Sequence, residues 1–108
     1  NKLYADFWDG GWKYTTGATL TTGTWYHAVM TYDGSYIKLY INNSLISSYN
    51  TVSPSTALVS NLGYRVGRRW DAYDSVDAYI PVAMVYNRAL TADEVSQNFN
   101  AHRRRFNI

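Results

Sequence analysis

The chain has 108 residues, of which 46% are hydrophobic and 17% aromatic, enough for one domain with its own core. Charged residues are sparse, and a net charge of +2 is too small to indicate nucleic-acid binding. The absence of cysteine excludes disulfides, thiolate metal sites and cysteine nucleophiles. No apolar run approaches the ~20 residues that a membrane helix needs. We therefore expect one domain over residues 1–108, with neither nucleic acid nor a membrane as its partner.

Short alternating segments open the chain. Residues 3–8 and 12–15 are predicted strands, joined by a turn at Gly10-Gly11. Residues 16–24 are rich in Thr and Gly, which predicts a loop.

The clearest pattern is a meander in the middle of the chain. Its first strand carries apolar side chains on both faces, so we expect it to be covered on both sides. Its two turns use Asp-Gly and Asn-Asn pairs, which accept the backbone angles of tight hairpins. The predicted elements are strand 25–32, turn Asp33-Gly34, strand 36–41, turn Asn42-Asn43 and strand 45–49.

The part that follows alternates loops with short strands. Residues 51–60 and 68–77 are polar and predict loops, and residues 62–67 predict a short strand. Residues 79–86 predict a last apolar strand. Pro81 interrupts it and cannot donate a ladder hydrogen bond, so it should lie at an edge or a bulge.

One helix is predicted, at the carboxyl end. Thr91 and Glu94 have the spacing of a capping box, which marks where the helix begins. Val95 and Phe99 follow at helical spacing and should dock on the sheet. Three arginines near the end of the helix suit its dipole.

Three motifs together resemble a known family. They are GTWYHAVMTYDGSYIKLYINNSLI, LGYRVGRR and VAMVYNRALTADEVSQNFNAHRRRF, in chain order. They are similar to the laminin-G-like branch of the concanavalin A-like jelly rolls. The closing stretch resembles copies of this domain in virion proteins of tailed phages, notably those infecting marine cyanobacteria. The resemblance implies an all-β fold, an antiparallel β-sandwich with one short C-terminal α-helix.

The chain departs from the family pattern at several points. Asn43 stands where the family usually has Gly. Ala78 stands near another usual Gly and Pro81 interrupts the last strand, so we expect a remodelled loop over residues 68–79. Family members also have several more strands before the point that matches the start of this chain. The resemblance therefore implies a jelly roll that is incomplete at its N-terminus, with the missing strands in further sequence or in a second chain.

Catalysis is not expected. Hydrolases on this fold use paired carboxylates, which must lie about 5–10 Å apart across the scissile bond. Asp6 and Asp9 are three residues apart and would point to opposite faces of a strand, and Glu94 is engaged in the cap. We expect a protein that is not an enzyme, unless its carboxylates lie in missing sequence.

Metal binding has two candidates, and a structural interpretation is favoured for each. His27 is either an acid–base or metal residue or, as we expect, a core histidine whose ring is bonded to the backbone. Asp71, Asp74 and Asp77 would suit Ca²⁺, but their spacing is not that of a calcium loop. An acidic loop paired with neighbouring arginines is preferred, so no metal or other cofactor is expected.

Glycan binding is the strongest candidate activity. Aromatic rings stack on sugars, and neighbouring carboxylates bind hydroxyl groups. The candidate glycan residues are Trp70, Asp71, Tyr73 and Asp74 in one loop and Trp8 and Trp12 around Gly10-Gly11. The alternative is that these rings pack on a neighbouring subunit, where Arg103, Arg104 and Arg105 are further candidate interface residues.

The sequence therefore predicts a non-enzymatic structural or adhesion module of a larger assembly. The resemblance implies a phage virion, as capsid decoration or fibre, with other virion chains as partners and an oligomeric state. The alternative is a lectin-like domain that binds cell-surface glycans, and the third is a glycoside hydrolase. The expected location is the virion or the extracellular space.

Overall fold

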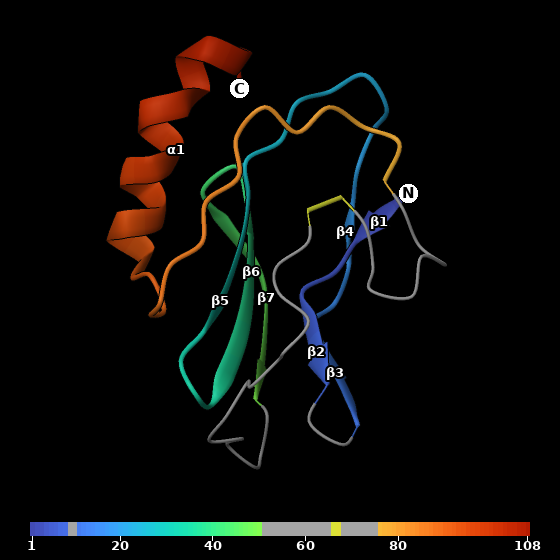
Figure 1. Ribbon diagram of the computed structural model, residues 1–108, viewed down its shortest axis with the longest axis vertical. Helices are drawn as coiled ribbons and strands as arrows, with labels where there is room; N and C mark the ends of the chain where they lie inside the picture. Colours follow the sequence, from blue (N-terminus) through green and yellow to red (C-terminus); the bar gives the residue numbers. More distant parts are fainter. Residues whose placement is uncertain (9–10, 51–65, 68–75) are drawn as a thin grey trace.

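The computed structural model describes residues 1–8, 11–50, 66–67 and 76–108, and three layers follow one another in it (Figure 1). The first is the helix α1 (Ala92–Phe106), and the second is a sheet of β5 (Ala28–Tyr32), β6 (Tyr36–Ile41) and β7 (Ser44–Asn50). The third holds two strand pairs, β1 (Lys2–Leu3) with β4 (Ala18–Thr19) and β2 (Asp6–Trp8) with β3 (Trp12–Tyr14). All pairs are antiparallel, as expected for a β-sandwich with a C-terminal helix.

The predicted meander is confirmed as the sheet β5–β6–β7. Asn42 and Asn43 adopt φ values of 49° and 68°, the left-handed region that their hairpin requires. At the other hairpin, Asp33 Oδ1 accepts the backbone N–H groups of Ser35 and Tyr36 at 2.9 and 2.7 Å. β5 begins later than predicted, at Ala28.

Alternation along β6 divides the buried residues between two faces. Ile37, Leu39 and Ile41 form a core cluster with Ala5 and Ala18 of the third layer. Their exposed fractions are at most 8%. This inner face joins the central sheet to the third layer.

The opposite face of the central sheet lies toward α1. Val95 and Phe99 are the buried residues of this helix, and Tyr40 is buried on β6. The rings of His27 and Phe99 lie 5.8 Å apart, and Asn43 Nδ2 donates to Ser96 Oγ at 3.2 Å. Val95 and Phe99 are therefore buried as the sequence predicts.

The strand predicted over residues 3–8 is divided into β1 and β2 at Tyr4-Ala5. Thr15, only 1% exposed, takes the place of a strand partner there. Its Oγ1 accepts the Ala5 N–H at 3.1 Å, and its own N–H donates to the Ala5 carbonyl at 2.9 Å. The loop predicted over 16–24 was wrong in part, because Ala18–Thr19 pairs with β1 as β4.

The last predicted strand, over residues 79–86, is not formed. The structure assigns no strand between residues 76 and 91, and this segment runs across the molecule to the start of α1 without joining the sheet (Figure 1). Pro81 lacks an N–H, which removes one ladder bond from any pairing here. The predictions for residues 51–60 and for most of 62–67 and 68–77 lie outside the described residues.

The cap of α1 is confirmed in detail. Glu94 N donates to Thr91 Oγ1 at 3.2 Å, and Thr91 N donates to Glu94 Oε2 at 2.9 Å, which completes a capping box. The helix ends at Phe106, where Asn107 adopts a left-handed φ of 55°. The arginines lie in the last turn, as the helix dipole favours.

Candidate functional site

Most of the predicted glycan residues fall outside the described part of the chain. Trp70, Asp71, Tyr73 and Asp74 all lie there, as does the side chain of Trp8. Their roles as glycan residues or Ca²⁺ ligands stay predictions. Of the three aspartates considered for Ca²⁺, only Asp77 lies in the described residues, and it is exposed.

Trp12 is described, and it belongs to an exposed aromatic face on β3. Trp12 and Tyr14 are two residues apart, so their side chains share one face of the strand. They are 46% and 59% exposed. Asp6 is paired with Tyr14 across the strands, so its carboxylate stands on the same face. This arrangement of two rings and a carboxylate suits a sugar.

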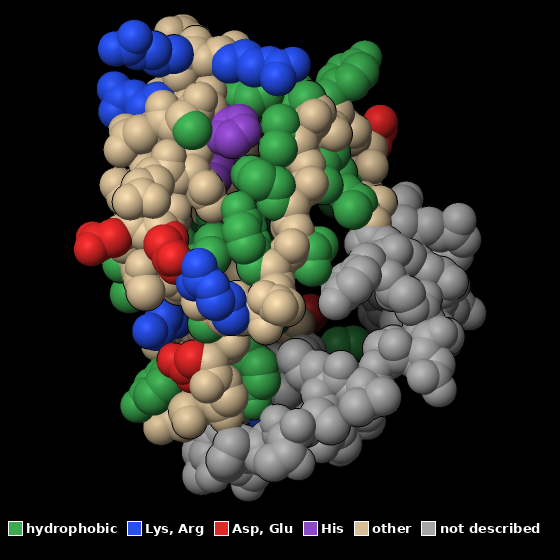
Figure 2. Space-filling model, turned by 60° about the vertical axis from the view of Figure 1, so that its left-hand side comes forward, with side chains coloured by type: hydrophobic (Ala, Val, Ile, Leu, Met, Phe, Trp, Pro, Cys, Tyr) green, Lys and Arg blue, Asp and Glu red, His purple; other side chains and the backbone are tan. Residues whose placement is uncertain are grey.

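The described residues form a groove that sequence reasoning missed. It has a volume of about 930 Å³ and lies between β5 and the segment 79–88. We call it the β5 groove. Val66, Leu90 and the inner side of α1 complete its lining. Figure 2 shows a band of hydrophobic side chains down this side of the molecule, with histidine beside its upper part.

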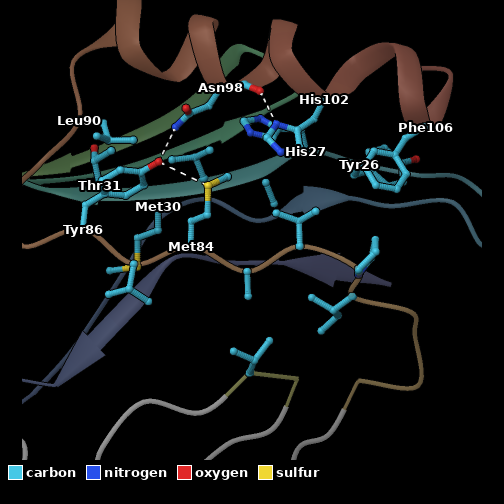
Figure 3. Close-up of a pocket in the computed structure, with 18 of the residues that line it drawn as sticks. Tyr26, His27, Met30, Thr31, Met84, Tyr86, Leu90, Asn98, His102 and Phe106 are labelled. Atoms are coloured by element: carbon cyan, nitrogen blue, oxygen red, sulfur yellow. Dashed lines mark hydrogen bonds between the residues drawn. The ribbon is translucent and has the colours of Figure 1, made fainter.

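One wall of the β5 groove carries a polar cluster between β5 and α1 (Figure 3). Asn98 Nδ2 donates to the Tyr86 hydroxyl at 3.1 Å, which links the segment 79–88 to the helix. His102 Nδ1 lies 2.9 Å from the Asn98 carbonyl oxygen, the distance of a ring N–H donating to it. The Tyr86 hydroxyl also lies 3.5 Å from Met84 Sδ, to which it can donate.

One ring nitrogen of His27 does not make the predicted bond to the backbone. Its Nδ1 is buried and has no hydrogen-bond partner in the structure. Burial, together with the nearby His102, lowers the pKa of His27 below its ordinary value of 6.5. The ring is therefore neutral at physiological pH. His27 lines the β5 groove, and its buried Nδ1 makes no hydrogen bond in the structure.

Two of the described carboxylates, Glu94 and Asp33, are held by hydrogen bonds within the fold. Two hydrogen bonds from Arg88 and the Thr91 N–H lower the pKa of Glu94 to about 2. Backbone N–H groups of Tyr36 and Ser35 lower the pKa of Asp33. Both groups are ionised at neutral pH and hold their hydrogen bonds as acceptors. Neither has the raised pKa that a general acid needs.

Two further features concern metals and membranes. Within residues 1–8, 11–50, 66–67 and 76–108, no three His, Asp or Glu side chains lie together as metal ligands would. In the same ranges, no helix combines the length and the apolar character of a membrane span.

The arginine run is exposed at the end of α1. Arg103 lies over the Phe99 ring at 5.6 Å and Arg105 over the Phe106 ring at 5.4 Å. These contacts hold the guanidinium groups near the helix surface. Lys and Arg side chains gather at the top of the face in Figure 2, at the height of this end of the helix. The interface role of these arginines stays a prediction.

A signal for the β5 groove was present in the sequence. Residues 79–86 are almost entirely apolar, yet Pro81 weakens them as a strand. When an apolar segment does not pair as a strand, its backbone N–H and C=O groups stay unpaired, and so do those of the strand beside it. We interpreted it as a strand and therefore missed the groove.

Comparison with known proteins supports the fold. A model of the laminin G type, described as the concanavalin A-like lectin/glucanases superfamily, matches residues 1–96. No match was found among curated proteins. The crystal structure of an S-layer domain-containing protein (residues 221–444) from Clostridium thermocellum is similar, with 24% sequence identity and a TM-score of 0.62. The match covers 91% of this chain but 63% of that one, so it leaves over a third of the solved structure unmatched.

The family model spans most of the chain, and it covers both the core of the sandwich and the start of α1. The chain belongs to the concanavalin A-like lectin/glucanases superfamily, in its laminin-G-like branch.

Proposed function

We propose that the chain is a non-enzymatic structural or adhesion module of an assembly outside the cell. The observation that carries this proposal is the amount of apolar surface left open along one segment. Tyr79 is 88% exposed, Val85 61% and Ile80 46%, and all three line the β5 groove. Contiguous apolar surface of this kind marks a site of contact with another molecule.

Two likenesses support a place at a surface. The similar structure is described as that of an S-layer domain-containing protein, and the fold that it shares with this chain suits a surface module. The closing residues, 87–106, resemble copies of the domain in phage virion proteins. The more specific form of the proposal is therefore a virion module, as capsid decoration or fibre.

Immunogold labelling tests the location. Antibodies raised against the 108-residue chain should label the outside of intact particles or cells from the native source before any lysis. Labelling that appears only after lysis contradicts the proposal. A second assay measures the release of reducing ends from a panel of β-glucans. Turnover of any of them would contradict a non-enzymatic module and indicate a glycoside hydrolase.

Glycan binding is the second candidate function. The observation that favours it is the exposed pair Trp12 and Tyr14, with Asp6 on the same face. Successive side chains on one face of a strand are about 6.6 Å apart, so two rings present a platform for an extended sugar. The predicted loop residues Trp70 and Tyr73 would add to such a surface.

A further inference from the structure

Among the strands that the structure describes, β5 is an edge strand whose backbone is open on one side. It pairs with β6, and no other described strand pairs with it. Asn42 N donates to the His27 carbonyl at one end of the ladder, and Asp33 N donates to the Tyr36 carbonyl at the other. Bonded pairs alternate in an antiparallel ladder, so Val29 and Thr31 also bond to β6. The N–H and C=O groups of Ala28 and Met30 therefore point away from β6.

The β5 groove follows this open edge. Its lining includes every residue from Trp25 to Tyr32 and every residue from Tyr79 to Arg88. Successive side chains of an extended chain point to opposite faces, so a groove over one face would be lined by alternate residues. An unbroken run on both sides means that the groove lies between two chain segments, in line with the sheet.

The lining is almost free of charge. Among the described lining residues, the one Lys, Arg, Asp or Glu side chain is that of Arg88, whose guanidinium already donates two hydrogen bonds to Glu94. Met30 and Met84 add flexible side chains that adjust to different apolar shapes. The buried Nδ1 of His27, another residue of the lining, has no hydrogen-bond partner. The groove thus suits an occupant that has uncharged side chains and a backbone able to form hydrogen bonds with β5.

The occupant must also have two open edges of its own. The segment 79–88 lines the side of the groove opposite β5, so an occupant that brought a second strand with it would meet this segment. In a second copy, β5 and β7 are each bonded to β6 and would bring it along. The other described strands, β1 with β4 and β2 with β3, are also paired, so a free extended segment fits the groove better than a strand of a second copy.

We propose that the β5 groove binds an extended, uncharged segment of a neighbouring polypeptide, which adds to the sheet as a strand beside β5. Strand addition of this kind takes its affinity from main-chain hydrogen bonds and its specificity from alternate side chains. This inference rests on the proposed function, since it names how the module holds a neighbour in its assembly.

The test uses the 108-residue chain and a capped peptide of alternating Val and Thr, about seven residues long, to match a typical strand. Hydrogen exchange by NMR reports the amides of Ala28 and Met30, and calorimetry reports affinity. We expect both amides to exchange freely in the chain alone and to slow when the peptide is added at millimolar concentration. The same peptide N-methylated along one edge keeps its side chains but should neither bind nor protect.

Met30→Pro gives the matching change on the protein. Proline removes the N–H that points into the groove but none that bonds to β6, and edge strands tolerate it in that position. Its affinity for the peptide should fall roughly three- to tenfold, whereas Met30→Val should keep it. If Met30→Pro does not fold, the N-methylated peptide still decides the outcome.

Several results would overturn the proposal. One is no slowing of either amide by the peptide, and another is equal binding of the N-methylated peptide, as for an apolar ligand. Slow exchange of both amides in the chain alone also overturns the proposal. In a monomer it would mean that a segment of the same chain pairs with β5, and in a dimer that a second copy does. Protection of both amides in the isolated native protein would assign the strand to its own polypeptide. Surface labelling without peptide binding removes this inference alone, whereas labelling only after lysis removes the proposed function.

Discussion

Arg88 donates two hydrogen bonds, of 2.7 and 2.6 Å, to the carboxylate of Glu94. The same carboxylate accepts the backbone N–H of Thr91 at 2.9 Å and so closes the cap of α1. One side chain therefore fixes both the start of the helix and the end of the segment that lines the β5 groove. This bidentate geometry is the strongest form of a charge-assisted pair.

Stability should fall in acid because of Glu94. Its pKa is lowered from 4.5 to about 2, so the unfolded state takes up a proton before the folded state does. The contribution is fully present above pH 4.5 and is lost as the pH falls toward 2. Urea midpoints measured over this range should decline, and Glu94→Gln should flatten part of the decline. Asp33, whose pKa is also lowered, should contribute to the decline as well.

Thr91→Ala is the companion variant, since it removes the other half of the capping box. A lost N-cap costs about 1 kcal/mol of the free energy of unfolding at neutral pH. Equal acid profiles for the wild type and Glu94→Gln would contradict the role given to this carboxylate.

His27 should give a second, separate pH dependence. Its pKa is lowered by burial first and by His102 second, so the folded state favours the neutral ring. Stability is then full above the unfolded pKa of 6.5 and falls as the pH drops below it. Thermal unfolding between about pH 5 and pH 8 measures this effect. His27→Gln should remove it, His102→Gln should reduce it, and an unchanged slope in both variants would refute the assignment.

Thr15→Val should destabilise the N-terminal layer. The change keeps the shape of a side chain that is 1% exposed but removes the oxygen that accepts the Ala5 N–H. A buried donor left without a partner costs about 1–3 kcal/mol. Thr19→Val on β4 is the matched control, because Thr19 is exposed and the change should stay within about 0.5 kcal/mol. Equal unfolding midpoints would show that the hydroxyl is not needed there.

The parts of the fold that the sequence predicted are those set by local chemistry. Asn42 and Asn43 accept positive φ and made the hairpin predictable, and the capping box marked the start of α1. The break at Tyr4-Ala5 was not predictable, because it depends on a hydroxyl ten residues away. Strand pairing beyond a hairpin is a property of tertiary contacts, which one strand's pattern does not contain.

The same limit applies to the candidate site. An apolar run such as residues 79–86 predicts burial, but the sequence does not say whether a neighbouring strand is present to bond with it. Trp12 was found because an aromatic beside a glycine turn is visible in the sequence. The unpartnered nitrogen of His27 was not found, since it depends on how α1 packs over β5.

Ile37→Ala should be the most damaging of the single changes in the sheet. Ile37 is 0% exposed at the centre of the core that joins the central sheet to the third layer. Truncating a buried isoleucine costs about 2–5 kcal/mol, through lost burial and the cavity left behind. Ile46→Ala on β7 removes the same atoms from a side chain that is 43% exposed, so it should cost far less. Chemical denaturation of both variants gives the comparison, and equal losses would place the core elsewhere.

Trp12→Ala tests glycan binding on the exposed face of β3. A sugar held by stacking should lose affinity about tenfold or more when the ring is removed, because an aromatic contact of this kind is worth roughly 1–3 kcal/mol. Trp25→Ala is the matched control, since Trp25 is 40% exposed but lies against Phe106 of α1, with their ring centroids 5.2 Å apart. Calorimetry with a panel of oligosaccharides measures both variants at low and high salt. Binding that Trp12→Ala leaves intact but Trp25→Ala abolishes would move the sugar to the helix side. If neither the wild type nor either variant binds a sugar, the glycan-binding function is contradicted and the structural module is the remaining proposal.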